Sequence, residues 1–388
     1  MKELLIKNIE NHNEIVLIED EEVVEKYEEN EEEQSIEGNI YIGKVQNVLS
    51  GLQSAFVDIG EKKNAFIHVK DILPKVDITK EPEVEEVPIT TLIKAGDPII
   101  VEVKRESTEY KGPKVSTHVS IVGRFVVVMP NCTFVTVSQK IENEEKRTSL
   151  KNIVEKELPE NFGAIVRTVA EDANLNDIKE DIKKSLEKWQ EIQNKKIEKY
   201  PQRIYSKGGI LKKTIVDLID NKLDRIVVNN EKIKNRIEDI LNEINATIKI
   251  EIREDVFSIY SVEKELKNIE NRKVWLKCGG FITIDKTEAL TAIDVNSGKF
   301  IGSKDLEKTV IKVNLEAAAE IAKQLRLRDI SGIIIIDFID MKTEEHKLAV
   351  TEELLKHSKK DRSKIQIEEF TKLNLMELTR KHINSKKK

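Results

Sequence analysis

The order of elements in residues 281–337 is the strongest constraint on the fold. Apolar and polar side chains alternate over residues 281–285 and again over 289–294, and the short turn between them predicts a β-hairpin. Residues 314–330 then repeat apolar side chains at helical spacing, which predicts an amphipathic helix. The isoleucines at 333–336 show no polar alternation, which is typical of a strand buried on both faces. This order of strand, helix and buried strand indicates an α/β layer.

A small barrel is predicted upstream. Residues 38–72 contain short alternating strands separated by turns at 50–51 and 60–63. Residues 76–97 are acidic and contain prolines, so we expect a loop before another strand at 98–106. A further pair of strands is predicted around residues 122–130 and 134–138.

The remaining segments complete a mixed α/β prediction. We expect residues 1–35 to form strands with an acidic loop over the run from Glu19 to Glu33. Residues 142–200 are predicted to be helical, and residues 206–270 to alternate helix and strand. A chain of 388 residues is too long for one ordinary core, which indicates two or three domains.

Composition narrows the class of protein. No apolar stretch approaches the length of a membrane span, and the start of the chain is not a signal peptide. Cys132 and Cys278 lie too far apart in sequence to form a metal-ligand pair, so we expect no disulfide scaffold and a cytoplasmic location. The net charge of −6 counts mildly against nucleic-acid binding, although basic residues cluster locally, for example at 111–114.

Two predicted strands end in aspartate, at Asp294 and Asp337. Ligands bind at strand ends in α/β layers, so these carboxylates are candidates to hold Mg²⁺, with Asn296 beside them. No Cys/His cluster lies near these residues in the sequence, so zinc is a poor candidate. Aspartate also caps turns locally, and spacing alone does not separate these two residues from Asp285 and Asp340.

Longer blocks of sequence resemble the ribonuclease E/G family. The catalytic region of that family is similar to GGFITIDKTEALTAIDVNSGK and to NLEAAAEIAKQLRLRDISGIIIIDFIDM. Its N-terminal blocks are similar to GNIYIGKV, SAFVDIG, AFIHV, KGPKVST and GRFVVVMP, and a shorter one to GAIVRT. The resemblance extends from about residue 38 to the end of the chain and is weakest over 206–270.

The resemblance implies an α/β fold of several subdomains. The expected order is an RNase H-like part at 1–35, an S1-like OB-fold at 36–117, a 5′-monophosphate sensor at 118–205, a second RNase H-like part at 206–270, and a DNase I-like catalytic subdomain at 271–388. The RNase H-like subdomain would therefore be split.

The resemblance also implies an activity. Asp294 and Asp337 match the magnesium ligands, for which Mn²⁺ is a possible substitute, and Asn296 matches the adjacent catalytic asparagine. The expected reaction is internal cleavage of single-stranded, A/U-rich RNA that leaves 5′-phosphate and 3′-hydroxyl ends. The expected substrates are ribosomal RNA precursors and messenger RNA.

RNA contacts and a 5′-end pocket are implied as well. Phe56, Phe66 and Lys111 match RNA-contacting positions, and Arg105 is a plausible addition; by itself Phe56 would be assigned to the barrel core. The sensor pocket matches Gly123, Val127, Arg167 and Thr168, and a further position that is usually arginine is Lys364. Lysine cannot bind a phosphate bidentately, so the sequence leaves the strength of 5′-end sensing open.

The family's zinc-linking Cys-x-x-Cys motif is absent from this sequence. Zinc-linked assembly is therefore not supported, and a metal-free homodimer through the catalytic subdomain stays open. The sequence also lacks the long tail of the E branch, which favours the G branch. Two other functions stay open at this point: a non-catalytic RNA-tethering protein and a deoxyribonuclease.

Overall fold

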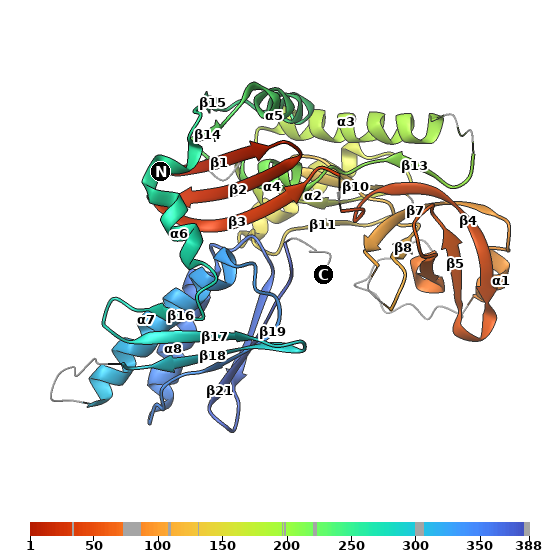
Figure 1. Cartoon of the computed structure of the whole chain (residues 1–388). Helices are drawn as coiled ribbons and strands as arrows, with labels where there is room; N and C mark the ends of the chain where they lie inside the picture. Colours follow the sequence, from red (N-terminus) through yellow and green to blue (C-terminus); the bar gives the residue numbers. More distant parts are fainter. Residues whose placement is uncertain are drawn as a thin grey trace.

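The computed structural model describes residues 1–32, 35–72, 87–107, 110–130, 132–195, 197, 199–219, 223–298 and 306–383. This part of the chain confirms a mixed α/β fold with several sheets, one of them a closed barrel (Figure 1). Much of the acidic loop predicted at 76–97 lies outside the described residues. Among the described helices, none combines the length and the apolar content that a bilayer crossing requires.

The N-terminal sheet joins segments that are far apart in sequence. Its strands follow the order β15-β14-β1-β2-β3. They are β1 (Lys2–Ile9), β2 (His12–Glu19), β3 (Glu22–Asn30), β14 (Arg225–Val228) and β15 (Lys249–Ile252). β1 pairs in parallel with β14, so the first strand completes a layer that the middle of the chain supplies (Figure 1).

Helices cover both faces of this sheet. Leu4 and Ile6 pack towards α4 (Ile210–Leu218) and α5 (Glu231–Glu243). Leu5 packs on the other face with residues of η4 (Val256–Ser261) and α6 (Val262–Asn268). The predicted acidic loop is wrong here, because most of that run forms strand β3, with apolar residues such as Val23 and Val24 buried in these two cores.

The barrel prediction is confirmed. Its five strands are β4 (Ile40–Leu49), β5 (Ser54–Asp58), β6 (Ala65–His68), β7 (Pro98–Arg105) and β8 (Lys114–Ser116). They pair in the order β4-β5-β6-β8-β7, and an extra β4–β7 pairing closes the ring. Short helices connect them: η1 (Ser50–Leu52), η2 (Val69–Asp71) and α1 (Ile89–Leu92). β13 (Gln202–Tyr205) adds outside the ring along β4.

A third sheet has the order β11-β12-β10-β9. Its strands are β9 (Ile121–Val122), β10 (Val126–Pro130), β11 (Val135–Val137) and β12 (Phe162–Val166), and it packs with α2 (Glu144–Glu157), η3 (Thr168–Asp172) and α3 (Leu175–Asn194). The two strands predicted around 122–130 and 134–138 are confirmed as β10 and β11, but they are not neighbours, because β12 lies between them. The segment 142–200 is accordingly not wholly helical: a strand separates its two helices.

The C-terminal sheet has the order β16-β17-β18-β19-β21-β20. Its strands are β16 (Lys273–Trp275), β17 (Phe281–Lys286), β18 (Leu290–Asn296), β19 (Gly332–Asp337), β20 (Ile365–Phe370) and β21 (Leu375–Arg380). The hairpin is confirmed as β17–β18, and the helix as α7 (Leu306–Leu327). α7 and α8 (Glu344–Ser358) pack on one face of this sheet.

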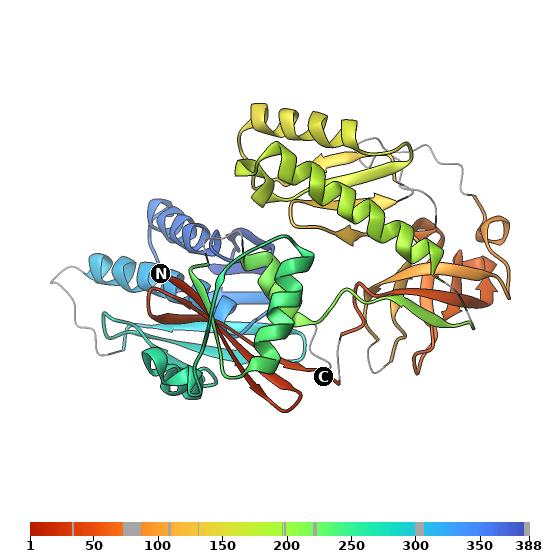
Figure 2. The ribbon, with the colours of Figure 1, turned by 90° about the horizontal axis from the view of Figure 1, so that it is seen from above.

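The prediction that the isoleucine strand is buried on both faces is wrong. Ile334 and Ile336 are fully buried under the helices, whereas Ile333 on the other face is 51% exposed. The absence of polar alternation in this strand therefore does not indicate burial on both faces. Figures 1 and 2 both place the barrel and the C-terminal sheet at opposite ends of the molecule.

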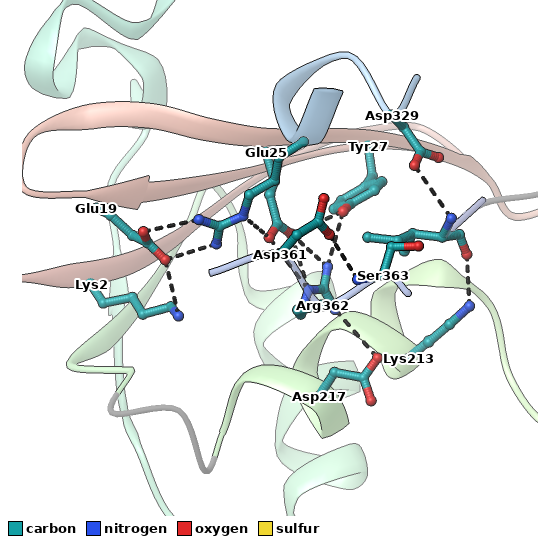
Figure 3. Close-up of polar contacts among 12 residues, drawn as sticks. Lys2, Glu19, Glu25, Tyr27, Lys213, Asp217, Asp329, Asp361, Arg362 and Ser363 are labelled. Carbon is teal, nitrogen blue, oxygen red and sulfur yellow. Dashed lines mark hydrogen bonds and ion pairs between the residues drawn. The ribbon is translucent and has the colours of Figure 1, made fainter. Parts of the chain in front are cut away.

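A buried ionic cluster joins the C-terminal segment to the N-terminal sheet. Glu25 on β3 is fully buried and accepts hydrogen bonds from Arg326 of α7 at 2.7 Å and from Arg362 at 2.6 Å (Figure 3). Tyr27 donates to the same carboxylate at 2.9 Å. Burial alone would raise the pKa of Glu25, but the two guanidinium charges and their hydrogen bonds lower it overall.

We expect Glu25→Ala to lower the free energy of unfolding by roughly 3–5 kcal/mol, because it leaves two buried arginines without their shared carboxylate. The matched control is Glu28→Ala on the same strand, whose carboxylate is exposed in an ion pair with Lys26; it should cost less than about 1 kcal/mol. Urea unfolding of both variants measures the difference. Equal losses would contradict the structural importance of the cluster.

A second prediction concerns the acid stability contributed by Glu19. Burial would raise its pKa, but the hydrogen bond and charge of Arg326, together with Lys2, lower it from 4.5 to about 2. A lowered native pKa contributes stability above the unfolded value and loses it as the pH falls towards the native value. Glu19→Gln should therefore melt at a lower temperature near neutrality and lose less stability between about pH 5 and about pH 3 than the wild type. Parallel pH profiles would refute this.

Candidate active site

Asp294 and Asp337 lie side by side at the ends of two parallel strands. β18 and β19 pair in parallel, and the two aspartates are directly opposite each other in the register. The alternation of β18 buries Ile293 and Val295 under the helices, which turns Asp294 to the uncovered face. Both carboxylates are exposed there.

The electrostatics of the neighbouring aspartates differ. Partial burial raises the pKa of Asp337, and the charges of Asp294 and Asp340 raise it further. Asp285 on β17 instead receives two hydrogen bonds from the Arg272 guanidinium, which lower its pKa. Asp285 is thus neutralised within the chain, whereas the pair formed by Asp294 and Asp337 has an excess of negative charge.

Asn296 continues the same face of β18 and donates its side-chain amide to the Asp294 carboxylate at 2.5 Å. Two glycines allow neighbouring segments of the backbone to lie close together around Asn296. A side chain at Gly280 would collide with the backbone oxygen of Asn296, and Gly298 has a φ of +59° and lies against the backbone of Gly279. The tight turns around Asn296 therefore require glycine.

Asn314 is a positioning residue that sequence reasoning missed. It is fully buried on α7; its amide donates to the backbone oxygen of Ile339 at 2.8 Å, and its oxygen accepts from the Ile339 N–H at 3.1 Å. This clamp fixes the segment directly after Asp337. A polar residue in the middle of an apolar helix face was the signal that could have indicated it.

The donor set suits a hard divalent cation. Within the described residues, no group of three or more His, Cys, Asp or Glu side chains forms a metal cage. Mg²⁺ is commonly held by only one or two carboxylates and completes its shell with water and substrate phosphate. The adjacent carboxylates Asp294 and Asp337, with their unbalanced charge, fit that description.

The barrel presents a pair of aromatic rings on its outer surface. Phe56 on β5 and Phe66 on β6 are directly opposite each other, with ring centroids 6.1 Å apart in an edge-to-face arrangement. Both are half-buried, whereas Ala55 and Ala65 beside them face the barrel core. Assignment of Phe56 to the barrel core is therefore excluded. Arg105 and Lys111 are exposed at the two ends of the β7–β8 connection.

Only some of the residues expected to bind a 5′-phosphate lie together in the structure. The Arg167 guanidinium donates to the backbone oxygens of Gly123 at 3.1 Å and of Arg124 at 2.9 Å. Thr168 hydrogen-bonds to Ser138, and Val127 is half-buried on β10. Lys364 is exposed, and no hydrogen bond or ion pair in the described chain joins it to this group.

Two aspartates that could not be found from the sequence make polar contacts in this region. Asp181 on α3 accepts hydrogen bonds from three consecutive backbone N–H groups at 124–126, and a Cβ at Gly123 would lie 2.5 Å from its carboxylate. Asp217 on α4 lies 2.8 Å from the Arg167 guanidinium. It also lies 3.4 Å from the Arg362 guanidinium (Figure 3). Arg167 and both aspartates line a cavity of about 640 Å³.

Comparison with known proteins assigns a family to this arrangement. The model of the "Ribonuclease E/G family" matches residues 120–383. Ribonuclease G of Haemophilus influenzae is 36% identical over 98% of this chain and 79% of its own length, and ribonuclease G of Escherichia coli K12 gives the same figures. Ribonuclease E of a Synechocystis species is 35% identical over 89% of this chain and 52% of its own length.

Proposed function

Because the chain belongs to the ribonuclease E/G family and is an endoribonuclease, we propose that it cleaves single-stranded, A/U-rich RNA with magnesium, or with Mn²⁺ as a substitute, at Asp294 and Asp337. The proposed products carry 5′-phosphate and 3′-hydroxyl ends, and the proposed substrates are ribosomal RNA precursors and messenger RNA in the cytoplasm. The observation that carries this proposal is the in-register pair of exposed carboxylates at the ends of β18 and β19.

The chain's own residues would prepare the site. Asp294 and Asp337 would hold the cation, and the Asn296 amide keeps the Asp294 carboxylate in one orientation. The Asn314 clamp on Ile339 limits movement of the backbone after Asp337. When bound, magnesium would withdraw charge from the phosphoryl oxygen and lower the pKa of a bound water.

The barrel supplies the surface for the single strand. Exposed aromatic rings stack on bases irrespective of sequence, and cations beside them follow the phosphates. Phe56 and Phe66 would provide the stacking, and Arg105 and Lys111 the charge. Because the barrel and the C-terminal sheet lie at opposite ends of the molecule (Figures 1 and 2), the RNA must span a long path or engage a second copy. The homodimer through the catalytic subdomain stays a prediction.

We expect internal cleavage of an A/U-rich RNA oligonucleotide with magnesium and none with EDTA. Asp294→Asn and Asp337→Asn should each reduce cleavage roughly 100-fold or more, because each removes a proposed metal ligand. Asp285→Asn is the matched control on the same sheet face and should retain activity, since Arg272 already neutralises that carboxylate.

RNA binding is followed by fluorescence anisotropy in parallel, with a DNA oligonucleotide of the same sequence as the sugar control. Undiminished cleavage by both aspartate variants would place the active centre elsewhere. Equal cleavage of DNA and RNA would overturn the proposed substrate class.

We propose in addition that Arg167 binds the 5′-monophosphate of the substrate. Its guanidinium is already oriented by the two backbone oxygens at Gly123 and Arg124, so Asp217 is not needed to position it. The Asp217 carboxylate instead offers a negative charge 2.8 Å from the guanidinium that a phosphate would contact. Asp217 would therefore weaken binding of the 5′-phosphate.

Asp217→Asn should lower KM for a 5′-monophosphorylated RNA about fivefold, which corresponds to removing one nearby charge repulsion of about 1 kcal/mol. The matched 5′-hydroxyl RNA should be cleaved as before. Arg167→Gln should abolish the difference between the two RNAs. A loss of 5′-phosphate preference in Asp217→Asn would show that Asp217 positions Arg167 instead of competing for it.

A further inference from the structure

An aromatic row leads along the C-terminal sheet to the paired aspartates. Trp275 on the edge strand β16 is directly opposite Phe281 on β17, and Phe281 is directly opposite Asn296 on β18. Residues that face each other across a sheet project from the same side. Trp275 and Phe281 therefore share the uncovered face with Asn296 and Asp294.

The outermost ring of this row is open to solvent. Trp275 is 61% exposed and contacts Phe281 edge-to-face, with ring centroids 5.4 Å apart. Its neighbour Val274 points the other way and packs against the core under the helices. An exposed tryptophan on the same side of the sheet as Asp294 therefore contributes little to the core, and most of its ring is open to a stacking partner.

A cation accompanies the two rings. The Lys273 ammonium lies 3.9 Å from the ring centroid of Trp275 and 3.5 Å from that of Phe281. Within the part of the chain that the structure describes, no carboxylate lies within ion-pair distance of Lys273. In the register Lys273 is opposite Thr283, which is in turn opposite Asp294. Aromatic rings with an adjoining cation are the combination that binds single-stranded nucleic acid.

We propose that Trp275, Phe281 and Lys273 form a nucleotide subsite of the active site. One base of the RNA stacks on Trp275, Phe281 holds that ring through the edge-to-face contact, and Lys273 neutralises the phosphate beside the base. β16 is two strand spacings, roughly 10 Å, from β18, so the bound nucleotide adjoins the one whose phosphate is cleaved. The subsite rests on the proposed function, because it takes Asp294 and Asp337 as the place of cleavage.

Tryptophan fluorescence tests the stacking without any need for cleavage. The chain has two tryptophans, and the other, Trp189, is only 6% exposed in the contact between α3 and the barrel. A Trp189→Phe, Asp337→Asn protein leaves Trp275 as the sole reporter and does not cut the RNA. Titration with an A/U-rich RNA should quench its emission saturably, with the same midpoint as the anisotropy of labelled RNA. Binding by anisotropy without quenching would overturn the subsite.

Cleavage kinetics then test its contribution to the reaction. Trp275→Ala should raise KM roughly tenfold, the effect of losing one stacked base, while Trp275→Phe retains most of the wild-type value. The matched control is Leu373→Ala, which truncates an exposed apolar side chain on the β20–β21 turn of the same sheet and should change nothing. Circular dichroism and melting verify that each variant is folded.

Abasic substrates separate a direct contact from a structural effect. In the wild type, one abasic nucleotide next to the cleaved bond should reproduce the loss seen in Trp275→Ala, and in that variant it should cause no further loss. If the losses from the abasic substrate and from Trp275→Ala add together, the contact is refuted. A changed oligomeric state of Trp275→Ala together with an unchanged KM would also refute it. If the wild type cuts no RNA, the proposed function fails, and the quenching titration still decides whether Trp275 binds a base.

Discussion

The arrangement of the chain depends on the buried ion pairs that the Glu25 carboxylate forms with two arginines. The two arginine partners of Glu25 are 301 and 337 residues away in sequence, one on α7, which covers the C-terminal sheet, and the other just beyond α8. A buried charge is costly when unpaired, so the N-terminal sheet and the C-terminal segment stabilise each other only when all three groups meet. Arg362 also forms an ion pair with Asp217, whose carboxylate lies 2.8 Å from the Arg167 guanidinium, so the same cluster extends to the proposed 5′-phosphate pocket.

The proposed active site lies on a sheet that helices cover on one face only. α7 and α8 pack on one face of the C-terminal sheet and leave the other open. Strand alternation then places the apolar residues of β18 under the helices, and Asp294 and Asn296 on the open face. Alternation acts in the same way in the barrel, where Ala55, Val57, Ala65 and Ile67 face inward and Phe56 and Phe66 face outward. In both cases a regular pattern of alternation presents the groups that the proposed reaction needs.

The features that could be predicted from the sequence are those that depend on local patterns. The β17–β18 hairpin, helix α7 and the barrel strands follow from alternation, helical spacing and turns, and the shared strand end of Asp294 and Asp337 follows from the α/β order. The sequence could not predict interactions that depend on distant partners. The acidic run became strand β3 because α7 and the segment after α8 supply arginines to it, and the isoleucine strand is half-exposed because only one helical layer covers its sheet. Asp181 and Asp217 were missed for the same reason, since their partners come from other elements.

In the proposed reaction, a divalent ion held by Asp294 and Asp337 binds the phosphate that is cleaved. The most direct measurement replaces one non-bridging oxygen of that phosphate with sulfur and compares cleavage rates with Mg²⁺ and with Mn²⁺. Sulfur is a poor ligand for the hard magnesium ion and a better one for manganese. We therefore expect one of the two sulfur isomers to be cleaved slowly with Mg²⁺ and its cleavage to recover with Mn²⁺. Equal cleavage of both isomers and of the unmodified RNA with Mg²⁺ would contradict it.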